Sequence, residues 1–377
     1  MGTSWVRLVV CEQKSGDNTP QILALIKKPS RGLRRGYVVN PEEAIETIRE
    51  ALAEAERTTK TKIRKLILGI GGVSLESKIS EGAILLSRPD SEVNETDISR
   101  AIEASETNLT EINNKQILHK IPLSYKLDGE KVLGQPEGLK GTKLEVRTLF
   151  ITVASQHLKE LVHVVEEAGG IIEDMVASPL AASLVVLTKV QKMAGCVLVN
   201  IGSQTTSIAV FEESLPLSLQ VFSIGSTDIT NDIALGFKIP LEEAEKIKKG
   251  EGEPLGTKKK LDEIIEARLS DIFEFIEMHL KKLGRNGLLP AGLVITGGGS
   301  VIPNIEDLAK SYFKLPARTA ASSIAMNSKS QIRDSSWSVA YGLCSYHMNE
   351  DNDQFFGSKI FTGARSSLWR WVKEFLP

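Results

Sequence analysis

One stretch decides the fold of this chain: Val197-Leu198-Val199-Asn200-Ile201-Gly202-Ser203-Gln204-Thr205-Thr206-Ser207-Ile208-Ala209-Val210-Phe211. It contains two apolar runs, each long enough for one buried strand, and between them a bend from Gly202 to Ser207 that is rich in hydroxyl groups. A hairpin with such small polar side chains leaves backbone N–H groups and hydroxyls free to face an anion. The stretch predicts a phosphate-binding hairpin, although most turns of this composition are only turns.

A second glycine-rich stretch strengthens this interpretation. An apolar run from Leu293 leads into Thr296-Gly297-Gly298-Gly299-Ser300, and a helix start follows at Asn304. Near the beginning of the chain, Gly2-Thr3-Ser4 precedes another strand and resembles the bend at 202–206. The similarity of these two bends indicates two related α/β halves around one cleft. Because a turn needs a preceding element, we also expect a further strand before Gly2, which this sequence lacks.

Composition narrows the class of protein. The chain has 377 residues, 41% hydrophobic and 25% charged, with a formal net charge of −2. These values suit a soluble globular protein of two or more domains, and no global basic field indicates a nucleic-acid partner. No apolar run approaches the roughly 20 residues of a membrane span. Cys11, Cys196 and Cys344 match no metal spacing and are expected to be reduced core residues.

Periodicity and capping residues predict the order of the elements. Pro41 and the acids after it open one helix, and Asn94 caps another. The basic segment from Lys27 to Arg35 is expected to be a loop. Strands are expected over 5–10, 21–26, 63–70, 75–79, 83–87, 116–125, 143–153, 171–177 and 292–296, and helices over 41–59, 95–106, 157–168, 179–190, 229–235, 241–249, 258–283 and 337–348.

The two phosphate-type hairpins, the turn at Ile224-Gly225-Ser226 and the Thr-Gly-Gly-Gly strand end together resemble the actin-like ATPase fold. The resemblance is closest to FtsA, the bacterial division protein that tethers FtsZ filaments to the membrane. Four segments carry it: Asp228-Ile229-Thr230-Asn231-Asp232-Ile233-Ala234, Leu241-Glu242-Glu243-Ala244-Glu245-Lys246-Ile247-Lys248, Leu118-His119-Lys120-Ile121-Pro122-Leu123-Ser124-Tyr125 and Pro179-Leu180-Ala181-Ala182-Ser183. It runs in order from Gly2 to about Met348.

This resemblance implies an α/β chain with two lobes around a nucleotide cleft and an FtsA-type 1C insertion. It divides the chain into subdomains known as 1A, 1C, 2A and 2B. Subdomain 1A covers 1–73 and 154–194, and the chain returns to it at 331–348. The SHS2-like subdomain 1C is the insertion at 74–153. Subdomain 2A covers 195–225 and 289–330, and subdomain 2B lies between its two parts, at 226–288. A flexible linker at 349–365 and an amphipathic membrane-targeting helix at 366–377 follow.

The resemblance also implies a site for ATP with Mg²⁺. The first turn and the central hairpin face the β- and γ-phosphates from opposite sides, and Gly225 lies near the ribose. Glu242 and Lys246, four residues apart on one helix face, reach the ribose and base. Three glycines let the backbone approach the nucleotide, although they could also form a tightly packed helix entry. The implied nucleotide-binding residues are Gly2, Thr3, Ser4, Gly202, Ser203, Gln204, Thr205, Thr206, Gly225, Glu242, Lys246, Gly297, Gly298 and Gly299.

The chain departs from the family pattern where that pattern has acids. Asn200 and Ser207 stand where the second hairpin normally carries two aspartates, Met1 stands near a third acid, and Ser178 replaces a glutamine. Carboxylates are the protein ligands that Mg²⁺ prefers. We therefore expect nucleotide binding with slow or absent hydrolysis, and we assign no catalytic residue.

The C-terminal segment is typical of a membrane-surface helix. At about 100° per residue, its apolar side chains span an arc of roughly 160°. Its 12 residues are too few for a stable helix in water, so it should fold on the bilayer, unless it docks on its own domain instead. The expected membrane-binding residues are Leu368, Trp369, Trp371, Val372, Phe375 and Leu376.

By this resemblance the chain is a scaffold on the cytoplasmic face of the bacterial membrane at the division site. It would anchor FtsZ filaments of the Z ring, bind the FtsZ C-terminal peptide through 2B, self-associate through 1C and meet other divisome proteins. The helix from Leu261 to Leu280 would contribute to the peptide site, or simply face the core. An alternative is a PilM-like component of type IV pilus assembly, which the Thr-Thr-Ser-Ile end of the hairpin favours. A sugar kinase would need a catalytic aspartate, for which the sequence offers no candidate.

Overall fold

The computed structural model describes residues 1–12, 21–86, 92–252, 256–320 and 334–348. The linker at 349–365 and the amphipathic segment at 366–377 lie outside the described residues. Within the described ranges, no helix is long and apolar enough to cross a membrane.

The central hairpin lies in a five-stranded sheet of order β13-β12-β11-β14-β15. Strand β11 (Cys196–Ile201) pairs antiparallel with β12 (Thr206–Glu212) and parallel with β14 (Leu293–Thr296). The outer strands are β13 (Leu215–Phe222) and β15 (Ala317–Thr319), neither of which the sequence pattern predicted.

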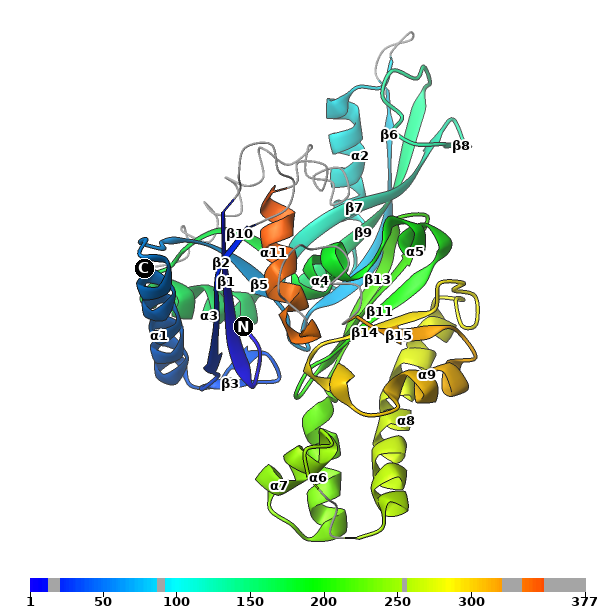
Figure 1. Cartoon of the computed structure of the whole chain (residues 1–377). Helices are drawn as coiled ribbons and strands as arrows, with labels where there is room; N and C mark the ends of the chain where they lie inside the picture. Colours follow the sequence, from blue (N-terminus) through cyan, green and yellow to red (C-terminus); the bar gives the residue numbers. More distant parts are fainter. Residues whose placement is uncertain (13–20, 87–91, 253–255, 321–333, 349–377) are drawn as a thin grey trace.

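Both faces of this sheet are buried, which explains its uninterrupted apolar runs. Val197 and Val199 belong to one apolar cluster, whereas Cys196 and Leu198 belong to another. The first cluster is covered by α6 (Ser226–Phe237), α7 (Leu241–Lys248), α8 (Lys258–Lys282) and α9 (Ile305–Phe313). Figure 1 shows α6, α7 and the start of α8 extending away from the sheet as a separate helical projection.

The first lobe is built from small sheets and the helices around them. Its helices are α1 (Pro41–Thr59), α3 (Ser155–Glu167), α4 (Ser178–Val186) and α11 (Ser338–Met348), the last preceded by the short helix η2 (Ser335–Trp337). The short helix α5 (Lys189–Ala194) follows α4 and packs against β12 of the second lobe. Its strands are β1 (Trp5–Glu12) paired with β2 (Gln21–Pro29), β3 (Leu33–Arg34) paired with β4 (Tyr37–Val38), and β5 (Lys65–Ile70) paired in parallel with β10 (Ile171–Ala177).

Helix α4 joins the two lobes. It has no polar face, and its leucine and alanine side chains lie in the same apolar cluster as Leu198 of β11. Its partner α11 crosses it so closely that a methyl group on Gly342 would overlap the carbonyl oxygen of Ala181. At the other side of α11, Cys344 lies 2.8 Å from Cys11 of β1 between the two Sγ atoms, and both residues are partly exposed. Of the three cysteines, only Cys196 is a fully buried core residue as predicted.

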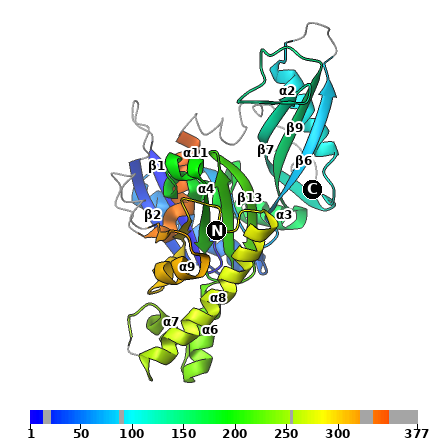
Figure 2. The ribbon, with the colours of Figure 1, turned by 90° about the vertical axis from the view of Figure 1, so that its right-hand side faces the viewer.

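The insertion forms a separate four-stranded sheet with one helix. Its strands β6 (Glu76–Leu85), β7 (Lys115–Leu127), β8 (Glu130–Val132) and β9 (Lys143–Ala154) have the order β6-β9-β7-β8. Helix α2 (Glu95–Thr107) begins with the predicted Asn94 cap, in a capping box with Asp97, and packs on one face of the sheet. Figure 2 shows this unit projecting from the end of the molecule opposite α6 and α7.

Most element types are confirmed, and the differences have local causes. The two strands expected at 75–79 and 83–87 are joined in β6, which runs without a break from Glu76 to Leu85, and residue 87 lies outside the described residues. Gly82 lets α2 pass directly over β6 without a side chain in the way. The helix expected over 179–190 is confirmed as far as Val186 but ends there, and Thr188 starts a new helix with its own capping box to Gln191. The loop expected over 27–35 is wrong, because β2 continues to Pro29 and β3 follows.

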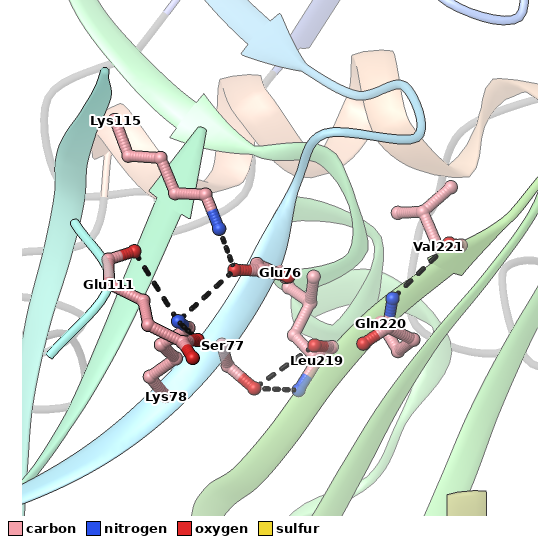
Figure 3. A network of polar contacts seen from close by, with 8 residues as sticks. All are labelled: Glu76, Ser77, Lys78, Glu111, Lys115, Leu219, Gln220 and Val221. Carbon is pink, nitrogen blue, oxygen red and sulfur yellow. Dashed lines mark hydrogen bonds and ion pairs between the residues drawn. The ribbon is translucent and has the colours of Figure 1, made fainter. Parts of the chain in front are cut away.

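A polar junction attaches the insertion to the sheet of the second lobe (Figure 3). The hydroxyl of Ser77 accepts a hydrogen bond from the N–H of Leu219 at 2.7 Å and donates one to its carbonyl oxygen at 3.0 Å. Beside it, Glu76 forms ion pairs with Lys115 and Lys78, and Lys78 also binds Glu111 at 2.8 Å. In sequence, the insertion follows from the first lobe, but its base is hydrogen-bonded to β13 of the second lobe.

We expect Ser77→Ala to weaken this junction. The substitution removes the hydroxyl that pairs with both the N–H and the carbonyl oxygen of Leu219, and leaving such buried groups unpaired costs about 1–3 kcal/mol. Urea denaturation should show a loss of this size, and limited proteolysis should cleave the insertion faster. Ser311→Ala, at an exposed position of α9, is the matched control. Equal stability of the two variants would contradict the importance of the junction.

Candidate functional site

A cavity of about 450 Å³ lies where the two lobes meet. It receives the ends of β11, β12 and β14 from the second lobe and the turn before β1 from the first. The lining residues used below are Gly2, Thr3, Ser4, Arg7, Lys27, Gly36, Asn200, Gly202, Ser203, Thr205, Ser207, Glu245, Lys249, Gly297, Gly298 and Asp334.

The central hairpin closes with a tight turn over residues 202–205. The N–H of Gly202 donates to the carbonyl oxygen of Thr205 at 2.8 Å. No hydrogen bond within the described part of the chain uses the backbone N–H of Ser203 or of Thr205, and both residues line the cavity. The predicted bend ends earlier than expected, because Ser207 already lies in β12, directly opposite Asn200. The turn therefore offers backbone donors and hydroxyl groups to an anion.

The beginning of α6 supports the hairpin from behind. The N–H groups of Ser226 and Thr227 donate to the carbonyl oxygens of Gly202 and Ser203 at 2.9 and 2.7 Å. Gly225 permits this contact, since a methyl group there would lie 2.6 Å from the Ser203 carbonyl oxygen. Two N–H groups at this helix start are thus used to hold the hairpin in place.

The glycine turn after β14 is held by buried hydroxyl groups. Gly297 has a φ of +89°, and Ser300 donates to its carbonyl oxygen at 2.8 Å. Ser335 contacts the same carbonyl oxygen at 3.2 Å and the Ser300 hydroxyl at 2.6 Å, while Thr296 donates to Ser338 at 3.0 Å. These bonds connect the strand end of the second lobe to the segment that returns the chain to the first.

On the first-lobe side, His157 fixes two loops that line the cavity. Its Nε2 lies 2.9 Å from the carbonyl oxygen of Gly36 and its Nδ1 lies 2.7 Å from the Ser74 hydroxyl. This pattern assigns the proton to Nε2, with Nδ1 as acceptor. Burial lowers the pKa of His157, and the bond to Gly36 acts in the opposite direction. The imidazole is thus neutral near pH 7 and has a positioning role, also stacking on Tyr37 at 4.3 Å between centroids.

The charged side chains that line the cavity differ between its two walls. On the wall formed by α7, the charges neutralise one another. Lys249 and Glu245 form an ion pair of 3.3 Å, and Glu245 also binds the buried Lys248 at 2.6 Å. Burial raises the pKa of Glu245, but the hydrogen bonds from Lys248 and Thr230 outweigh it and the net shift is downward. Glu245 is therefore ionised and neutralised by neighbouring lysines.

Arg7 lies at the opposite wall, on β1. Its guanidinium carbon is 5.8 Å from the centroid of the Trp337 ring. Burial lowers the pKa of Arg7, and the carboxylate of Asp334 raises it. An arginine side chain remains protonated at neutral pH in either case. With Lys27, Arg7 leaves this wall positively charged.

The structure brings together most of the residues named from the sequence. Gly2, Thr3, Ser4, Gly202, Ser203, Thr205, Gly297 and Gly298 line the cavity. The remaining six, which are Gln204, Thr206, Gly225, Gly299, Glu242 and Lys246, are not among its lining residues. Glu245 of α7 and Lys249, which caps the C-terminal end of α7, line it instead, each three residues further along the chain than expected.

Two of these six residues make other contacts. The side-chain oxygen of Gln204 accepts a hydrogen bond from the N–H of Arg35 at 3.0 Å, which joins the lobes across the cavity rim. Thr206 is fully buried and donates to the carbonyl oxygen of Ile224 at 2.8 Å. Sequence reasoning missed Arg7, although a charge inside the apolar run of β1 was a usable signal. Asp334 had no such signal.

Comparison with known proteins places the chain in a family. The family model described as cell division protein FtsA matches residues 197–342, and a model described as the SHS2 domain inserted in FtsA matches residues 72–152. Cell division protein FtsA of Neisseria meningitidis is 32% identical, covering 91% of this chain and 87% of its own, and that of Bacillus subtilis is 30% identical, covering 96% and 84%. The chain is a member of the FtsA family.

Solved structures agree on the fold of this FtsA-family chain. The PilM–PilN type IV pilus biogenesis complex aligns with a TM-score of 0.67 at 18% identity, covering 92% of this chain and 96% of the other. The ethanolamine utilization protein EutJ from Carboxydothermus hydrogenoformans aligns with a TM-score of 0.55 at 16% identity, covering 92% and 87%. At these identities the comparison shows the fold alone, and the predicted actin-like fold with an FtsA-type insertion is confirmed.

We expect the glycines of the turn after β14 to differ in their tolerance of a side chain. A methyl group on Gly297 would overlap Oδ1 of Asn200 and lie 2.5 Å from the Ile201 carbonyl oxygen, at a positive φ. Gly297→Ala should therefore lower the free energy of unfolding by more than about 1 kcal/mol. A methyl group on Gly298 meets nothing within 4 Å, so Gly298→Ala should change it by less than about 0.5 kcal/mol. Chemical denaturation of both variants checks this, and equal losses would contradict it.

Proposed function

We propose that this FtsA-family chain binds ATP in the cavity between its lobes and acts in division as a scaffold that anchors FtsZ filaments to the cytoplasmic membrane. The observation that carries the nucleotide proposal is the convergence of three turns that contain glycine, at 2–4, 202–205 and 297–298, on one cavity. Its volume of about 450 Å³ lies in the range usual for small-molecule sites. Hydrolysis is slow or absent in this proposal, because Asn200 and Ser207 are neutral.

A charge placed at Gly298 tests the nucleotide site. Gly298 lines the cavity, and its Cβ position is free of neighbours, so Gly298→Asp should fold while repelling phosphate groups. Affinity for a fluorescent ATP analogue should fall by about tenfold or more, which corresponds to at least about 1.4 kcal/mol.

Asn113→Asp adds the same charge at an exposed position outside the cavity and should leave the affinity unchanged. Circular dichroism checks that both variants fold. Equal affinity of Gly298→Asp and the unchanged chain would refute the assignment of the cavity.

The proposed surface for the FtsZ C-terminal peptide is subdomain 2B, at 226–288. The core face of α8 is already occupied, because Leu269, Ile272 and Ile276 are buried. Exposed apolar side chains remain at the junction of α6 and α7, where Leu235 is 78% and Leu241 is 56% exposed. Apolar anchors of this kind suit a short peptide.

Two further contacts complete the scaffold proposal. The insertion at 74–153 is the proposed surface for self-association and for other divisome proteins. The C-terminal segment, with Leu368, Trp369, Trp371, Val372, Phe375 and Leu376, is the proposed contact with membrane lipids, and its support is the sequence pattern. Many weak tails along one filament would bind a membrane strongly through effective concentration.

Peptide binding separates this proposal from the PilM-like alternative. Fluorescence anisotropy should show binding of the FtsZ C-terminal peptide and none of a PilN N-terminal peptide. Leu241→Glu should weaken the binding by about tenfold. Leu133→Glu, at a 90% exposed position of the insertion, should not change it. Preference for the PilN peptide would favour the pilus function instead.

A further inference from the structure

The described residues that line the cavity do not fit the metal that the family resemblance implies. Asn200 and Ser207 are direct cross-strand partners at the ends of β11 and β12, and neither carries a charge. Mg²⁺ dehydrates reluctantly and is normally held by one or two carboxylates together with phosphate oxygens. At the hairpin, the protein offers only amide and hydroxyl oxygens to such an ion.

Two carboxylates do line the cavity within the described residues, but both already bind protein donors. Glu245 accepts hydrogen bonds from Lys248 and Thr230, each at 2.6 Å. Asp334 accepts from the N–H of Ser336 at 2.8 Å and from its hydroxyl at 2.7 Å, which caps η2. In the described part of the chain, no group of three or more His, Cys, Asp or Glu is placed to hold a metal ion.

Arg7 offers the opposite chemistry. It lines the same cavity, and its Nε is buried without a hydrogen-bond partner among the described residues. The alternation of β1 explains its direction, since the neighbouring Val6 packs against α1 in a separate apolar cluster. A guanidinium presents a planar set of donors that matches phosphate oxygens in pairs. A buried donor without a partner is costly unless a ligand supplies an acceptor.

The geometry points to a cleft that binds nucleoside polyphosphate without a divalent cation, with Arg7 supplying the positive charge opposite the phosphates. This inference rests on the nucleotide binding proposed above. The turn at 202–205 supplies backbone donors, and Arg7 replaces the charge that a metal ion brings to a carboxylate-lined cleft. Lys249 is less suited to this role, because it forms an ion pair with Glu245 at 3.3 Å, whereas Asp334 acts on Arg7 without forming an ion pair among the described residues.

The test titrates the full chain with a fluorescent ATP analogue, once in excess Mg²⁺ and once in EDTA. The two dissociation constants should agree within about threefold. Arg7→Gln should weaken binding in EDTA by about tenfold or more, because the charge and the paired donors are lost. Arg7→Lys should give an intermediate loss of about fivefold, because the charge remains without the planar pair of donors. Arg57→Gln, an exposed arginine on α1, is the matched control and should bind as the unchanged chain does.

The results distinguish three claims: the nucleotide site, its independence of a metal ion, and the role of Arg7. Binding that weakens by about tenfold or more in EDTA overturns the inference and leaves the proposed nucleotide site in place. No binding under either condition overturns both. Binding that is metal-independent but unaffected in Arg7→Gln overturns the role of Arg7. If Arg7→Gln does not fold, Arg7→Lys decides, since unchanged affinity in EDTA overturns the role and a loss of about fivefold supports it.

Discussion

The parallel pairing of β11 with β14 is the constraint on which the rest of the structure depends. It sets Asn200 beside Thr296, so that two distant segments of the chain end at one edge of the sheet. Open α/β sheets bind ligands beyond the carboxyl ends of their strands, and the cavity lies there. The register is strongly specified, because a shift by one residue would exchange the apolar faces that Leu198 and Val199 present to two different clusters.

The strand ends alone would not hold the cavity in shape, and buried neutral groups complete it. Thr296, Ser300, Ser335 and Ser338 are almost fully buried and hydrogen-bond with one another or with the carbonyl oxygen of Gly297. Hydroxyl groups suit this position because they satisfy buried carbonyl groups without the desolvation cost of a charge. The turn is thereby tied to the segment before α11, and its backbone is fixed where a ligand would approach.

Sequence patterns predicted the features that depend on neighbouring residues, such as helix starts. They missed features that depend on contacts between distant parts of the chain. Asn94 and Pro41 marked helix starts correctly, since capping depends on residues three or four positions apart. The short strand β15 was missed because its pairing with β14 is its main support. The three glycine turns were predicted from their residue types, whereas the exchange of Glu242 and Lys246 for Glu245 and Lys249 depends on the rotation of α7 about its axis. Asp334 enters the cavity through tertiary packing, which no spacing rule describes.

The two lobes are joined unequally on the two sides of the cavity, and this determines how a ligand can enter. Behind the cavity, α4 lies in one apolar cluster with β11, and separating them would expose many side chains to water. At the rim, the contact is the hydrogen bond between Gln204 and the N–H of Arg35, a kind of bond worth about 0.5–1.5 kcal/mol. The bond at the rim is therefore much weaker than the packing behind the cavity. A ligand that passes this rim meets Gln204, one of the six predicted residues that do not line the cavity.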